Sequence, residues 1–186
     1  PTDNYAAWLV YLDLINFENI NSGSQLGAAR ALRMFGEHYF FSDTLQFKRT
    51  IRLTGFGSGQ AAAAQSILRW PVSKAGIIVN APNTLGEGVQ ATPTRGGDGS
   101  IIEGFSIRGG EGPANELKSG VWFRGRGILR DCTTRGFAGH GFLVRASEAS
   151  SDPTIIGNAN GTIVENIRTE NNIMSGGRAV GADANA

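Results

Sequence analysis

Two short segments of similar sequence, GVWFR and GFLVR, carry the side chains best suited to binding chemistry. Successive side chains of a β-strand point to opposite faces. The first segment therefore turns Trp122 and Arg124 outward, and the second turns Leu143 and Arg145 outward. An indole plane flanked by guanidinium groups suits a sugar ring that bears carboxylates, through stacking and bidentate hydrogen bonds. The two segments thus predict a carbohydrate-binding strip on the outside of a sheet.

The same strip has a second interpretation. A third segment, GIIVN, places Ile78 in line with Trp122 and Leu143, and exposed apolar strips usually mark interfaces. The loop over 147–160 or another subunit would then cover the strip. His140 lies between two glycines at the start of a strand, where it is either an accessible general base or a plain turn histidine. The candidates for substrate binding are Trp122, Arg124, His140 and Arg145.

Paired carboxylates offer another kind of chemistry. Glu103 and Glu165 occupy equivalent places in two further segments, and Arg130 holds that place in the segment between them. Parallel strands lie about 4.8 Å apart, so the two glutamates would be about 10 Å apart, slightly too wide for most inverting glycoside hydrolysis. The favoured interpretation is a Glu–Arg–Glu ladder that neutralises itself, and the catalytic residues stay unknown.

Metal and cofactor chemistry has little support in the sequence. The histidines are His38 and His140, without HxH or HExxH spacing, and Cys132 is the only cysteine. One cysteine excludes an internal disulfide and a cysteine-based metal cage. Asp98 and Asp152 are turn residues first and calcium ligands only distantly. We therefore expect no metal and no cofactor.

The composition is that of one glycine-rich globular domain. The chain has 186 residues, of which 40% are hydrophobic and 27 are glycine. The usual glycine share is about 7%, and many short segments joined by tight turns would raise it. The formal net charge of +1 removes the electrostatic argument for a nucleic-acid binder. No apolar run is long enough to span a bilayer.

The second half of the chain repeats itself. The segments SIIEGFSIRGG, GILRDCTTRGF and TIVENIRTENN align position by position, with starts 27 and 35 residues apart. The glycine-led segments form a second series between them, and the polar stretch 147–160 accounts for the longer interval. Two alternating strand types are typical of a β-solenoid, in which equivalent residues of successive coils stack. Gly104, Asp131 and Asn166 share a turn-forming column, and we expect Asn166 to adopt left-handed backbone angles at a bend.

One amphipathic helix precedes the strands. In residues 3–17 an apolar stripe at helical spacing follows Asp3, a plausible N-cap. The stripe consists of Tyr5, Trp8, Leu9, Leu12 and Ile15. Residues 25–35 could form a second short helix. We therefore expect residues 1–35 to be a capping helical segment and residues 36–186 to be strand coils, with a loop insertion at 147–160.

These features resemble the right-handed parallel β-helix proteins of the pectin-lyase-like superfamily. TIVENIRTENN resembles the superfamily's coil, in which apolar residues flank a turn asparagine. FGEHYFFSDTLQFKRTIRLTGFGSGQ resembles its usual opening, an aromatic residue after a glycine turn, then a strand and a glycine-rich turn. The similarity covers about residues 30–180 and implies an all-β, right-handed, single-stranded parallel β-helix (solenoid) with an N-terminal capping α-helix. Members are usually longer, so we expect this chain to be part of a longer protein or to be completed by partners.

The superfamily includes polysaccharide lyases, glycoside hydrolases and phage tailspikes, and the shared opening specifies the fold rather than the reaction. The resemblance implies recognition of a polysaccharide, with or without lyase or hydrolase cleavage. It implies an extracellular or virion-associated homotrimer. From the charge and the lengths of the apolar runs we expect neither a nucleic-acid nor a membrane partner. The alternative is a structural virion or surface protein whose solenoid is a rigid trimeric stalk. Exposure of Trp122 in a groove would favour binding, and its burial against a neighbour would favour the stalk.

Overall fold

The computed structural model describes residues 2–12, 30–36, 38–47, 50–57, 65–79, 97, 99–145, 159 and 161–180. A helix covers residues 5–12, and β-strands make up most of the rest. The other elements are β1 (Arg30–Arg33), β2 (His38–Phe40), β3 (Leu45–Phe47), β4 (Ile51–Thr54), β5 (Ser66–Val72), β6 (Ile77–Val79), β7 (Ser100–Glu103), β8 (Phe105–Gly110), the short 3₁₀-helix η2 (Glu116–Lys118), β9 (Val121–Phe123), β10 (Gly127–Arg135), β11 (His140–Val144), β12 (Ile163–Glu170) and β13 (Ser175–Ala179).

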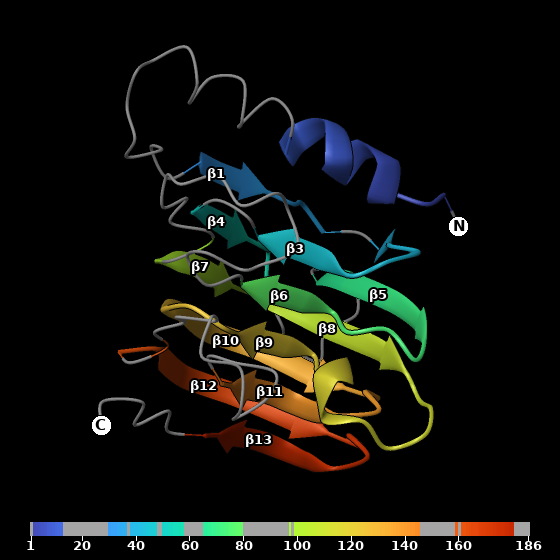
Figure 1. Cartoon of the computed structure of the whole chain (residues 1–186). Coiled ribbons are helices and arrows are strands. Elements are labelled where there is room, and N and C mark those ends of the chain that lie inside the picture. Colours follow the sequence, from blue (N-terminus) through green and yellow to red (C-terminus); the bar gives the residue numbers. More distant parts are fainter. Residues whose placement is uncertain are drawn as a thin grey trace, which may run out of the picture.

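The strands form two sheets in which neighbouring strands of the described chain are parallel (Figure 1). One sheet has eight strands in the order β1-β4-β7-β10-β8-β5-β2, with β12 beside β10, and the other has five in the order β13-β11-β9-β6-β3. The first half of β10 pairs with β7 and its second half with β8, so the long strands belong to two ladders at once. The three ladders are β1-β4-β7-β10-β12, β2-β5-β8-β10-β12 and β3-β6-β9-β11-β13. A mostly β chain with parallel sheets and an N-terminal helix is therefore confirmed.

The register of the ladders confirms the alignment of the repeated segments. Leu129 pairs with Ile102 on one side and with Val164 on the other. The glycine-led segments GIIVN, GVWFR and GFLVR likewise lie side by side in the same register. Apolar residues recur at these places because each layer must cover the apolar interior of the next.

A left-handed bend joins the first two ladders in three successive layers. Gly104, Asp131 and Asn166 have φ angles of 76°, 54° and 50°. Among residues with a side chain, Asp and Asn adopt this region most readily. The amide of Asn166 in β12 also donates a hydrogen bond to the carboxylate of Asp131 in the neighbouring strand β10. The predicted left-handed bend at Asn166 is confirmed, and it turns a long strand from one ladder into the next.

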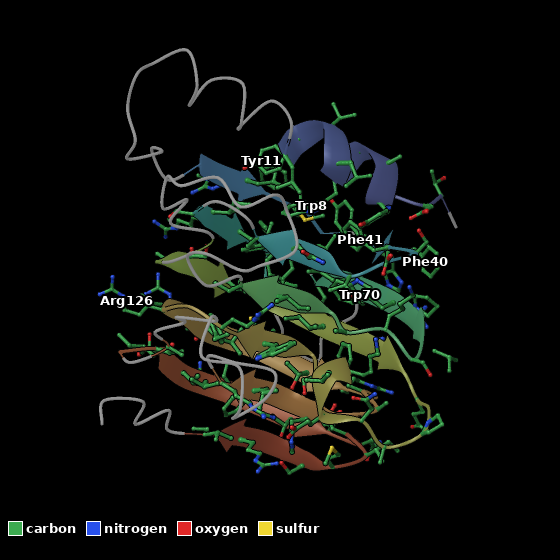
Figure 2. The ribbon with its side chains drawn as sticks, viewed as in Figure 1. Trp8, Tyr11, Phe40, Phe41, Trp70 and Arg126 are labelled. Atoms are coloured by element: carbon green, nitrogen blue, oxygen red, sulfur yellow. The ribbon has the colours of Figure 1, made fainter. Side chains whose placement is uncertain are left out.

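The N-terminal helix covers one end of the apolar interior. Trp8 and Leu12 belong to the buried core cluster, and the Trp8 ring stacks on Phe47 of β3 at a centroid distance of 5.3 Å. Figure 2 shows Trp8 and Tyr11 between the helix and the strands. Burial of Trp8 and Leu12 is confirmed, whereas Leu9 is 44% exposed because it lies on the outer side of the helix.

The side chain of Asp3 caps the start of the helix, while the carbonyl oxygen of Asn4 accepts its first backbone hydrogen bond. The Asp3 carboxylate accepts hydrogen bonds from the backbone N–H groups of Tyr5 and Ser42, both at 3.0 Å. Hydrogen bonds from Ser42 and Tyr5 lower the pKa of Asp3. The cap therefore also ties the helix to the segment after β2.

One local expectation is wrong, and several lie outside the described residues. Arg30–Arg33 form strand β1 rather than part of a second helix, because parallel pairing with β4 overrides the local helix propensity. The strands therefore begin before residue 36. Ile15, Asp98, Asp152 and most of the 147–160 loop lie outside the described residues.

A close approach of backbones requires glycine where the chain enters the third ladder. A Cβ atom on Gly120 would lie 2.5 Å from the carbonyl oxygen of Gly141 and 3.0 Å from the ring of Phe137. We expect Gly120→Ala to lower the free energy of unfolding by about 1–3 kcal/mol, because backbone and ring must shift. Gly36→Ala is the control, since nothing lies within 4 Å of its Cβ position, and it should change that free energy by less than about 0.5 kcal/mol. Equal effects of the two in chemical denaturation would contradict the steric explanation.

Candidate functional site

The predicted strip faces outward but is not exposed. Val121 and Phe123 belong to the core cluster and Trp122 between them does not, which confirms the predicted alternation. Trp122 is nevertheless only 2% exposed, and Leu143 is 0% exposed. The exposure predicted for Trp122 and Leu143 is therefore wrong, because alternation decides the face of a side chain and not what covers it.

Contacts within the chain engage both the ring and the polar group of Trp122. Its indole N–H donates a hydrogen bond of 2.9 Å to the carbonyl oxygen of Arg145. The guanidinium of Arg124 lies 5.3 Å from the ring centroid, which is a cation–π contact. Arg124 is itself buried. The structure therefore brings these three predicted residues together, but they contact one another instead of forming an open platform for a sugar.

A carboxylate that the sequence did not suggest neutralises Arg145. Glu116, at the start of η2, forms ion pairs with Arg145 and with Arg178 of β13, the latter at 2.8 Å. The start of η2 is fixed by Asn115, whose side chain accepts a hydrogen bond from the N–H of Leu117. An anionic ligand at Arg145 would have to displace Glu116.

His140 is buried rather than accessible. It is 4% exposed, and its Nδ1 lies 2.7 Å from the hydroxyl of Ser175 in the neighbouring strand. Burial lowers the pKa of His140 and Arg178 lowers it further, while Glu116 opposes the shift. Among the described residues no carboxylate is hydrogen-bonded to the imidazole ring, so the arrangement of a catalytic triad is not formed there. The accessibility considered for His140 is therefore wrong.

Arginine and threonine side chains hold the Glu103 carboxylate. It accepts hydrogen bonds from Arg52 Nε at 2.9 Å, from the Thr54 hydroxyl at 2.9 Å and from Arg130 Nε at 2.7 Å. Arg130 also lies 4.0 Å from Glu165 in the next layer. Burial raises the pKa of Glu103, but the hydrogen bonds from Arg130, Arg52 and Thr54 outweigh it and lower the pKa to about 2. The Glu–Arg–Glu ladder is confirmed, and an ionised Glu103 cannot act as a general acid at neutral pH.

A second charged column was not identified from the sequence. Arg69 of β5 pairs with Arg108 of β8, and Arg108 pairs with Arg135 of β10. We call these three residues the arginine row. The row lies between Phe40 in the layer on one side and Glu170 in the layer on the other. The available signal was an arginine at the ninth position of both SIIEGFSIRGG and GILRDCTTRGF.

Among the described residues, no three His, Cys, Asp or Glu side chains are grouped so as to hold a metal ion. No helix in that part of the chain is both long enough and apolar enough to cross a bilayer. No family model, curated protein or solved structure matches the chain.

Proposed function

We propose that the chain is a right-handed, single-stranded parallel β-helix that recognises a polysaccharide along its outer wall. The three parallel ladders support the fold, because each strand pairs with the strand of the same kind in the next layer. The left-handed residues stacked at the bend support it too, since a solenoid needs the same corner in every coil. An extracellular or virion-associated protein fits this proposal.

The observation that carries the functional proposal is the register of the outward side chains. Equivalent outward positions recur in successive layers, about 4.8 Å apart. A linear polymer also presents similar groups at a regular spacing, so several of its units can contact several layers at once. Stacked repeats form extended binding surfaces for this reason.

A second candidate, a structural stalk, is favoured by one observation. Trp122 and Leu143 are buried within the chain, so the aromatic platform expected for sugar stacking is closed. A homotrimeric stalk would also cover the apolar side chains left exposed in β12 and in the turn between β12 and β13. These are Ile163, Ile173 and Met174.

The two candidates differ in how binding depends on ligand length. We expect oligosaccharides that span several layers to bind at least about tenfold tighter than the corresponding monosaccharide, because each added unit contacts a further layer. Calorimetry with a size series from each of several linear polysaccharides measures this.

We also expect no release of reducing ends, because the one carboxylate column described is held as a neutralising ladder. Failure to bind any polysaccharide would leave the stalk as the function.

A further inference from the structure

We propose that the arginine row binds the anionic groups of an acidic polysaccharide that bears carboxylates or sulfates and runs across the strands. The inference rests on the proposed function and adds to it a site and a chemical class of ligand. The site lies on the second ladder, away from the predicted strip of the third ladder.

The geometry of the row is that of three like charges in adjacent layers. Arg69, Arg108 and Arg135 occupy one column of three neighbouring parallel strands, so their backbones are about 4.8 Å apart. Arg69 and Arg135 are exposed and Arg108 is half-buried. The pKa of Arg108 is lowered by burial and by the neighbouring charges of Arg135 and Arg69. Glu170 opposes this lowering of the Arg108 pKa but does not outweigh it.

The same chain shows how a charged column is neutralised when its role is structural. In the first ladder Glu103, Arg130 and Glu165 share one column and alternate in sign. Arg52, which lies two residues before the Thr54 of that column, forms a further ion pair with Glu103. The arginine row lacks this alternation, although the chain has 16 acidic residues to 17 basic ones. A column of three arginines with one acidic residue, Glu170, at its end is therefore expected to have a partner that supplies further negative charge.

At one end of the arginine row the chain supplies its own negative charge, Glu170. Glu170 lies 4.0 Å from Arg135 and 2.5 Å from Arg168, so it is the counter-ion of the last layer. The Nε of Arg108 donates a hydrogen bond of 3.0 Å to the hydroxyl of Ser106, which orients its guanidinium. Within the described residues no ion pair engages Arg69 or Arg108. The strongest anion site is therefore predicted around these two residues, with Arg135 shared between ligand and Glu170.

The chemistry of the row selects the ligand. A guanidinium binds a carboxylate or sulfate through two parallel hydrogen bonds, and three of them at strand spacing match a chain whose charged groups recur. Single-stranded nucleic acid is normally held by aromatic side chains under successive bases, and the row has one aromatic neighbour, Phe40 at its end. The net charge of +1 also lacks the basic excess of a nucleic-acid binder. An acidic polysaccharide is the better match.

The test compares charge-removing variants in and away from the row. Arg108→Gln and the triple Arg69→Gln/Arg108→Gln/Arg135→Gln are compared with Arg126→Gln, whose arginine lies in the turn before β10. Figure 2 places Arg126 and Phe40, the end of the row, on opposite sides of the molecule. Probes are polygalacturonate, heparin, neutral dextran and single-stranded DNA, with thermal unfolding as the check on folding. Arg108→Lys separates the guanidinium geometry from its charge.

We expect Arg108→Gln to weaken binding of an acidic polysaccharide about tenfold or more, the triple variant to abolish it, and Arg126→Gln to change it less than about twofold. Arg108→Lys should be intermediate. Unchanged binding in a folded triple variant would overturn the arginine row while the proposed function stands. Binding of neutral dextran but of neither acidic polysaccharide would also overturn the arginine row, while the proposed function stands. No binding to any polysaccharide would overturn the proposed function as well, and tighter binding of DNA, lost in the triple variant, would replace the polysaccharide as the ligand.

Discussion

Replacing Trp70 by alanine is expected to lower the free energy of unfolding by about 3–5 kcal/mol, the usual cost of removing a large buried aromatic side chain. Trp70 is 4% exposed and stacks on Phe41 at a centroid distance of 5.5 Å. It also contacts the Phe137 ring at 6.3 Å, and its indole N–H donates a 3.0 Å hydrogen bond to the Asp43 carbonyl oxygen. Figure 2 shows Phe41 and Trp70 close together beneath the helix. The ring thus joins separate layers, and the cavity left by alanine could not be closed by one neighbour moving.

Two control variants separate packing from the hydrogen bond. Trp70→Phe keeps an aromatic ring and loses the indole N–H, so we expect a smaller loss, dominated by about 1 kcal/mol for the hydrogen bond. Phe56→Ala removes an aromatic side chain that is 60% exposed, and it should change the free energy by less than about 0.5 kcal/mol. Chemical denaturation measures all three. A loss for Trp70→Ala no larger than that for Phe56→Ala would show that the ring does not pack as described.

Replacing Glu103 by glutamine is expected to lower the free energy of unfolding by about 3–4 kcal/mol at neutral pH, since a pKa difference of one unit corresponds to about 1.4 kcal/mol. The hydrogen bonds from the arginines and Thr54 outweigh burial and depress the pKa of Glu103 from 4.5 to about 2 in the folded chain. Glutamine keeps the shape of the side chain but leaves Arg52 and Arg130 without their shared counter-ion. Denaturation curves of the two proteins at a series of pH values measure the effect.

The pH dependence has a definite sign. Because the folded-state pKa of Glu103 is lowered, the ionised carboxylate stabilises the fold above its ordinary pKa of 4.5, and this contribution is lost as the pH falls towards about 2. The difference between the natural chain and Glu103→Gln should therefore shrink across that range. Glu165→Gln is the matched control, because the Glu165 side chain is 55% exposed and 4.0 Å from Arg130. It should cost less than about 0.5 kcal/mol, and a constant difference for Glu103→Gln at every pH would contradict the ion-ladder explanation.

The arginine row and the Glu103 ladder show two uses of the same column geometry. In the ladder the chain supplies both signs of charge, and the expected loss on mutation is one of stability. In the row three arginines share one acidic neighbour, Glu170, at the end of the column, so charge removal there should cost binding and leave the fold intact. Mutations in the Glu103 ladder should therefore change thermal unfolding, whereas mutations in the arginine row should change ligand binding.

The sequence by itself determined the layering of this protein. Segments such as GILRDCTTRGF and TIVENIRTENN align because stacked layers need the same type of residue at the same column. The register of Leu129 between Ile102 and Val164 follows from that requirement alone. The bend at Asn166 could be predicted for a local reason, since few residues tolerate a left-handed backbone.

Only the tertiary structure decided what is exposed and which charges meet. Alternation placed Trp122 on the outer face, but the structure shows it buried, with Arg124 on its ring and its indole N–H bonded to the backbone of Arg145. Arg69 belongs to a segment that does not align with the repeats by sequence, so its place in the arginine row depends on pairing with Arg108 across a layer. Pairing between distant segments is set by the path of the chain through its turns and by competition with local propensity, and neither can be read from the residues of one segment.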